Sequence, residues 1–220
     1  QAEADAWPTY GAYNAPCKLK VADINVYGVL DDDDRTIIGN PHPDFTYGIN
    51  IDLTYKNLAL NIFGNGSQGN DIYNYVRYFA DFNTFQGNRS KRALYDAWQP
   101  SNPTAPVSQW VAANPGATSP IMDANDQISS RPSSYFVEDG SFFRLKNVQL
   151  TYNFPESILS TVGGLSRASV YIQGQNLATF TDYSGLNPEV QTGNNTNLGY
   201  DGGFLPVSRT FLLGLNVTFN

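Results

Sequence analysis

An acidic segment near the start of the chain has the residue types and spacing of a calcium-binding loop. Counted from Asp23 as the first residue of the loop, Asn25 is the third and Gly28 the sixth. Asp31 and Asp34 are the ninth and twelfth. Ca²⁺ binds oxygen ligands from such a loop, with a glycine at its sharp turn. Tyr27 takes the place of one ligand and Asp34 the place of the usual glutamate. Two interpretations stay open: a Ca²⁺ site made by Asp23, Asn25, Asp31 and Asp34, or a solvated acidic loop.

The other reactive residue types are scarce. The chain contains one cysteine, Cys17, and one histidine, His42. These numbers exclude an intrachain disulfide, a zinc cluster and a two-histidine metal site within the 220 residues. His42 lies between two prolines, and no G-x-S-x-G motif accompanies it. We therefore expect no catalytic residues, no enzyme activity and no cofactor besides the possible Ca²⁺. The formal charge of −7 also argues against a nucleic-acid partner.

Aromatic residues also lie in two long segments, 67–140 and 181–206, that are rich in asparagine, glycine and proline. Tyr73, Trp98 and Trp110 lie in the first segment and Tyr183 lies in the second. Aromatic faces can stack on sugars or peptide side chains while amides bind hydroxyl groups, so these four residues are candidate ligand contacts. The alternative is that the rings pack within the loops or against a partner protein.

The elements that would position these residues are β-strands. Apolar residues alternate with polar or small ones in five segments, which are 45–55, 58–66, 141–154, 167–180 and 207–219. In the last of these, Phe211, Leu213, Leu215, Val217 and Phe219 share one face. A period of two over so many residues predicts antiparallel strands and an all-β fold.

Alternation alone fits both a soluble β-sandwich and a transmembrane β-barrel. Aromatic residues bound the apolar faces, as at Phe45 with Tyr55 and at Phe211 with Phe219. About ten residues, tilted by about 45°, span roughly 23 Å along the bilayer normal, which matches the apolar band of an outer-membrane barrel. The connections alternate between short and long, as do the periplasmic turns and external loops of such barrels. These features favour a transmembrane barrel in the bacterial outer membrane.

The expected layout has two parts. Residues 1–44 form an extracellular loop region with the acidic loop, and residues 45–220 hold the strands with large extracellular loops at 67–140 and 181–206. Bacterial single-chain barrels have an even number of at least about eight strands, and lipid does not tolerate open edges. Five strands are therefore expected to be a C-terminal piece of a longer barrel, or to be completed by another chain.

Several phrases make the chain resemble a known family. They are FVEDGSFFRLKNVQLTY (Phe136 to Tyr152), GQNLATFTDYSGLNPE (Gly174 to Glu189), SRTFLLGLNVTF (Ser208 to Phe219) and the stretch from Asp31 to Asn74. These phrases resemble the C-terminal barrel of SusC/RagA-type TonB-dependent outer-membrane transporters of Bacteroidetes. The resemblance covers most of the chain from about Val21, and is weakest from Tyr75 to Ser134. It implies a C-terminal segment of a barrel with roughly 22 strands.

The resemblance also implies a function. The intact protein would import oligosaccharides or peptides with energy delivered through TonB, and a SusD-like surface lipoprotein would close over it as a lid. Membrane lipid and lipopolysaccharide would be further partners. A non-transporting surface adhesin or glycan-binding β domain is the alternative. The apolar residues 211, 213, 215 and 217 followed by Phe219 also resemble the terminal signal that the outer-membrane assembly machinery recognises.

Overall fold

The computed structural model describes residues 17–82, 89–106, 109–121, 126, 128–161, 164–190 and 195–219. These residues form two compact units. One is drawn from residues up to Gly39 and from Tyr73–Val137, and the other from Asn40–Ile72 and from Glu138 onward. None of the helices in the described ranges is both long and apolar enough to cross a membrane.

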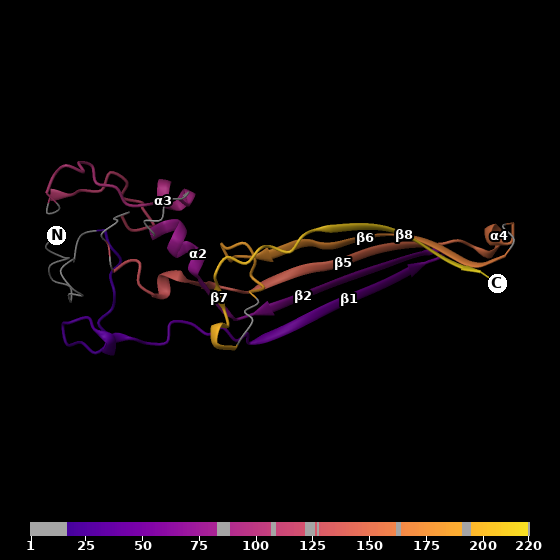
Figure 1. Ribbon diagram of the computed structural model, residues 1–220, viewed down its shortest axis with the longest axis horizontal. Coiled ribbons are helices and arrows are strands. Elements are labelled where there is room, and N and C mark those ends of the chain that lie inside the picture. Colours follow the sequence, from indigo (N-terminus) through magenta and orange to yellow (C-terminus); the bar gives the residue numbers. More distant parts are fainter. Residues whose placement is uncertain are drawn as a thin grey trace. The chain divides into compact units, whose positions relative to one another are not determined.

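The second unit is built on one long antiparallel sheet (Figure 1). Its strands, in spatial order, are β1 (Phe45–Tyr55), β2 (Leu58–Gln68), β5 (Phe142–Asn153), β6 (Leu165–Thr181) and β8 (Thr210–Phe219). Each strand corresponds to one of the five alternating segments, and β1 covers the same residues as the first. β1 and β8 are the outer strands, so each has one edge that pairs with no other strand in the described residues.

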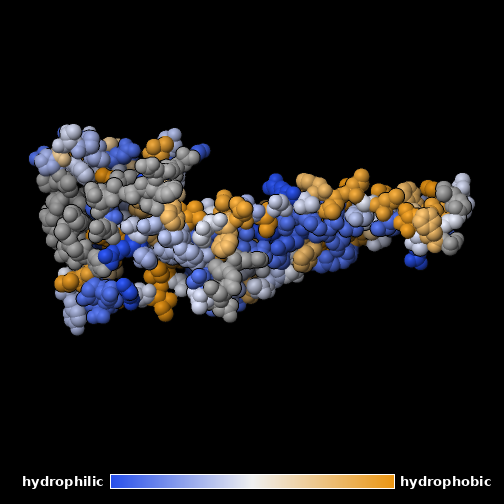
Figure 2. Space-filling model, viewed as in Figure 1, coloured by the Kyte–Doolittle hydropathy of each residue, from blue (hydrophilic) through white to orange (hydrophobic). Residues whose placement is uncertain are grey.

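The strand register separates apolar and polar side chains onto two faces. Ile51 pairs with Ile62, which pairs with Val148 on the next strand, whereas the neighbouring row pairs Asp52 with Asn61. Directly opposed residues point to the same face of a sheet, so these two rows place apolar and polar side chains on opposite faces. Figure 2 shows the resulting hydrophilic band over the middle of the sheet, with hydrophobic side chains along its border.

Hydrogen bonds join the polar side chains into a chain that crosses four strands. Asn61 Nδ2 donates to Asp52 Oδ1 at 2.7 Å, and Asn147 Nδ2 donates to Asn61 Oδ1 at 3.0 Å. Gln173 on β6 donates to Asn147, and Asn50 on β1 donates to Asp52. We call these five residues the amide ladder. It is almost uncharged, because Asp52 is its only ionisable member.

Aromatic rings border the apolar face at both ends. At the end next to the long connections, the ring centroids of Phe45 and Tyr47 lie 5.9 Å apart, those of Tyr47 and Phe143 6.1 Å, and those of Phe143 and Phe180 6.3 Å. At the opposite end stand Tyr55, Tyr152, Phe154 and Phe219. The apolar face between these two rows is largely exposed, with Leu53 at 57% and Leu213 at 76%.

The short and long connections lie at opposite ends of the sheet. Figure 1 places the β1–β2 turn, the short helix α4 (Glu156–Leu159) and the C-terminus together at one end. The strand register agrees, because Tyr55, Leu58 and Tyr152 form one row across β1, β2 and β5. Both long connections therefore leave from the other end of the sheet.

The start of β8 differs from the expected position. Pairing with β6 begins at Thr210, three residues after the predicted 207. Asn176 explains the difference, because its backbone is in the left-handed region (φ 52°) and its side-chain Nδ2 donates to the carbonyl of Ser208 at 3.2 Å. A residue in that conformation interrupts the ladder, so β6 cannot extend its pairing toward Val207.

The other unit contains short elements between loops. They are η1 (Asp32–Asp34), α2 (Tyr75–Arg77), the π-helical turn η2 (Tyr78–Phe82), α3 (Lys91–Tyr95) and η4 (Ser134–Phe136). Asp81 organises this unit: it is 2% exposed, accepts a hydrogen bond from Ser90 and pairs with Arg92 Nη2 at 2.7 Å. Several short elements thus lie within the described residues of the predicted loop 67–140.

Four further short elements complete the described structure. β4 (Val137–Asp139), β3 (Asp71–Asn74) and β7 (Tyr200–Asp201) form a small sheet in that order, and η5 (Asn195–Asn197) precedes β7.

Candidate functional site

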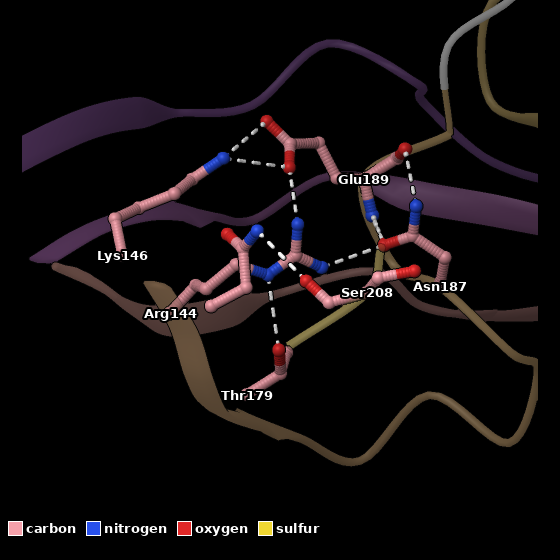
Figure 3. Close-up of polar contacts among 7 residues, drawn as sticks. Arg144, Lys146, Thr179, Asn187, Glu189 and Ser208 are labelled. Atoms are coloured by element: carbon pink, nitrogen blue, oxygen red, sulfur yellow. Dashed lines mark hydrogen bonds and ion pairs between the residues drawn. The ribbon is translucent and has the colours of Figure 1, made fainter. Parts of the chain in front are cut away.

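A polar cluster of the second unit surrounds a buried arginine. Arg144 stands on the polar face of β5, and its side chain is only 2% exposed. Its Nε donates to Thr179 Oγ1 on β6 at 3.0 Å, and its Nη2 donates to Asn187 Oδ1 at 2.6 Å (Figure 3). Its Nη1 forms an ion pair with Glu189. The guanidinium therefore joins two strands to the connection that follows β6.

A second cation reinforces this connection. Lys146 Nζ lies 3.1 Å from Glu189 Oε2, and Asn187 accepts the backbone N–H of Glu189 at 3.2 Å (Figure 3). Lys146 can reach this carboxylate because the register shifts between Leu145 and Asn147, which leaves Lys146 outside regular pairing. We call Arg144, Lys146, Thr179, Asn187 and Glu189 the arginine clamp. It holds the segment 185–190 against the sheet.

The sequence reasoning did not single out the arginine clamp. One signal could have found it, because Arg144 and Lys146 are the two charged residues of a strand whose polar positions otherwise carry amides and hydroxyls. A charge that is buried needs a partner of opposite sign. The partner, Glu189, lies 45 residues away, at the end of the phrase GQNLATFTDYSGLNPE.

A polar cavity lies at the same end of the sheet. Its volume is about 490 Å³, and its lining includes Pro41, Asn65, Ser67, Phe142 and Glu189. Asn65 Oδ1 is buried and accepts no hydrogen bond from the residues described. Because the clamp fixes Glu189, it also fixes one wall of this cavity. Such a cavity can take a group that donates hydrogen bonds.

The structure brings two of the four candidate ligand-binding aromatics together. The rings of Trp98 and Trp110 lie 6.0 Å apart, and Trp110 Nε1 donates to the carbonyl of Ala105 at 3.0 Å. Both rings are half-buried. Tyr73 belongs to a separate aromatic group, with its ring 5.7 Å from that of Phe136. Burial and the neighbouring tyrosines raise the pKa of Tyr73 above its ordinary value.

Tyr183 lies in the second unit and is only 5% exposed. Its hydroxyl donates to the carboxylate of Asp201, which is itself 1% exposed. This contact joins the start of the second long connection to β7, which lies near the end of the same connection. The ligand-binding role of all four aromatics stays a prediction.

The carboxylates of the acidic loop bind backbone N–H groups of the same loop. Asp23 accepts from Val26 at 2.6 Å and from Gly28 at 2.7 Å, and Asp34 accepts from Ile24 at 2.8 Å and from Asp31 at 2.9 Å. These backbone hydrogen bonds lower the pKa of Asp34, with that from Asp31 the largest cause. Among the described residues, no three or more His, Cys, Asp or Glu side chains gather where they could hold a metal. Calcium binding at Asp23, Asn25, Asp31 and Asp34 stays a prediction.

Two further sequence features have clear positions. Phe211, Leu213, Leu215, Val217 and Phe219 share the apolar face of β8, and Phe211 and Leu213 are 77% and 76% exposed. Cys17 is half-buried in the first unit, where burial raises its thiol pKa to about 11. A thiol with this pKa is almost entirely protonated at neutral pH and is a poor nucleophile.

Comparison with known proteins decides the family. No family model matches the chain. It is 40% identical over 204 residues to the TonB-dependent receptor P3 of Formosa agariphila, a match that covers 90% of this chain and 18% of the relative. It is also 30% identical over 215 residues to the TonB-dependent receptor SusC of Bacteroides thetaiotaomicron, covering 96% of this chain and 18% of SusC. The chain belongs to the TonB-dependent receptors of the SusC/RagA type.

Solved structures agree with this membership. The RagAB peptide transporter superposes with a TM-score of 0.67 at 25% identity, covering 86% of this chain and 19% of that chain. Its "closed-closed" state gives a TM-score of 0.66 at 26% identity, with the same coverage. This SusC/RagA-type chain spans about a fifth of the length of the curated relatives it matches. Its relatives are receptors and importers, not enzymes, as expected from the sequence.

Proposed function

We propose that this chain is the C-terminal part of the barrel of a TonB-dependent outer-membrane importer. The observation that carries the proposal is the two-faced sheet. Its exposed apolar face is bordered by aromatic rows at both ends, including Phe45 and Phe143 at one end and Tyr55 and Tyr152 at the other. Aromatic rows of this kind mark the two interfaces of a membrane-spanning barrel. The apolar face then contacts lipid and the amide ladder faces the lumen.

The free edges of β1 and β8 support a larger barrel. An unpaired strand edge in lipid leaves several N–H and C=O groups without partners, at several kcal/mol each. Further strands of the same receptor would close a barrel of roughly 22 strands. In this arrangement the short turns face the periplasm, and the long connections with the arginine clamp face the outside.

The proposed cargo is an oligosaccharide or a peptide, taken up with a SusD-like lipoprotein lid and with energy from TonB. RagAB is described as a peptide importer, and the chain matches SusC closely enough to share its family. The half-buried pair Trp98 and Trp110 is the candidate contact for such cargo, because indole rings stack on sugar faces and apolar side chains. Tyr73 is a second candidate.

Uptake measurements on cells with and without the receptor gene test the proposal. Fluorescent oligosaccharides and peptides should enter the periplasm of cells with the gene, and a proton uncoupler should stop entry while surface binding persists. The purified full receptor should also give a heat-modifiable band in detergent gels. Binding without energy-dependent entry would instead support a non-transporting adhesin and overturn the proposal.

A further inference from the structure

A second cavity of the second unit lies beside the arginine clamp. Its volume is about 260 Å³, and it is bounded by β6, by the segment 185–188 and by the residues that lead into β8. Arg144 of the clamp and Arg209 both line it, together with Thr179 and Asn187. Pairing between β6 and β8 stops at the pair of Gln175 and Thr210. The cavity lies beyond this pair, between the last residues of β6 and the residues that precede Thr210.

The charges around this cavity are not balanced. Arg144 and Lys146 share the single carboxylate of Glu189. The exposed side chain of Arg209 forms no hydrogen bond or ion pair with any residue that the structure describes. These four side chains carry three positive charges and one negative charge, so their net charge is +2 in a chain whose net charge is −7. The excess of positive charge at this point favours an anion.

The hydrogen-bonding groups indicate which kind of anion fits. A guanidinium offers a planar fork that matches the two oxygens of a carboxylate. Thr179 Oγ1 already accepts from Arg144 Nε, so its own hydroxyl proton is available to a second oxygen. Together, the Arg209 guanidinium and the Thr179 hydroxyl offer donors to the two oxygens of one carboxylate.

We propose that Arg209 and Thr179 bind a carboxylate of the transported substrate. The inference rests on the proposed import function and specifies the substrate class further. A carboxylate occurs in the uronic acids of acidic oligosaccharides and at the C-terminus of peptides, and the chemistry at Arg209 is the same for both. Arg209 is then a specificity residue, and the clamp is the scaffold that fixes the opposite wall of its cavity.

The test compares matched probes with and without the carboxylate on the purified full receptor. The first pair is trigalacturonate and its methyl ester, and the second pair is triglycine and triglycinamide. Isothermal titration is performed on the wild type, on Arg209→Gln and on Arg167→Gln. Arg167 is the matched control, because it is exposed and lies opposite Thr218 in the strand register, at the other end of the sheet. Each variant replaces one arginine with glutamine, so the two variants have the same net charge.

We expect wild type and Arg167→Gln to bind at least one acid probe more tightly than its ester or amide. In Arg209→Gln the affinity for that acid should fall by about tenfold or more, because a hydrogen-bonded charge pair is lost. The affinity for the matching ester or amide should not change. The pair that responds identifies the source of the carboxylate.

Three results would overturn the inference. They are equal binding of acid and neutral probes by the wild type, an equal loss for both in Arg209→Gln, and no binding of any probe at millimolar concentration. Loss of co-purified lipopolysaccharide in Arg209→Gln, with carboxylate binding unchanged, would assign the cavity to lipid headgroups and also overturn it. Energy-dependent uptake measured in parallel separates this failure from failure of the import function.

Discussion

Replacing Arg144 with methionine should release the segment 185–190 from the sheet. Removing one partner of a buried ion pair costs about 3–5 kcal/mol, because the other charge stays buried. Glu189 is 26% exposed and keeps Lys146 at 3.1 Å, so part of that cost is avoided. We expect the free energy for local opening of this segment to fall by about 2–3 kcal/mol, which is about 30- to 150-fold in the opening equilibrium.

Hydrogen–deuterium exchange of the full receptor measures this opening. The amide of Glu189, which donates to Asn187 at 3.2 Å, should exchange faster by the same factor if opening limits exchange. Peptides from the β1–β2 hairpin should be unchanged. Arg167→Met, at an exposed position, is the control for loss of a positive charge. An increase of less than about twofold at Glu189 would refute the view that the arginine clamp holds the segment.

Three further predictions concern other parts of the chain. Cys17 should react with iodoacetamide about 100-fold more slowly at pH 7 than a thiol with the ordinary pKa of 9.0, because its pKa is about 11; a rate equal to that of a free thiol would contradict the burial. The lowered pKa of Asp34 means that its carboxylate stabilises the acidic loop above pH 3.8, and this contribution should be lost as pH falls further. Exchange of the loop amides should rise in that range for wild type but not for Asp34→Asn. Removal of Phe219 and Asn220 should abolish outer-membrane insertion while leaving expression intact; normal insertion in membrane fractions would count against the assembly signal.

The sheet was predictable because its information is local. In β1, every second residue from Phe45 to Tyr55 is apolar, and a period of two specifies both the strand and its two faces. The places where the ladder departs from regularity were not predictable in the same way. The left-handed backbone of Asn176 and the register shift at Lys146 depend on hydrogen bonds to Ser208 and Glu189. Those partners are distant in sequence.

In the candidate site, too, local features were predictable and contacts between distant residues were not. The sequence identified Trp98 and Trp110 as aromatic residues of one long loop, and the structure adds that their rings are neighbours. The arginine clamp could not be assembled from spacing, since Arg144, Thr179 and Glu189 come from two strands and the connection beyond them. Burial of Arg144 depends on the tertiary structure. A buried guanidinium needs a partner of opposite charge, whereas an exposed one does not.

The open edges of β1 and β8 have a practical consequence for anyone who expresses these 220 residues alone. Each edge presents a row of backbone donors and acceptors beside an exposed apolar face. Such strands add readily to one another, so copies of the isolated segment should associate edge to edge and aggregate in water. Work on the arginine clamp or on Arg209 therefore requires the complete receptor in detergent or lipid.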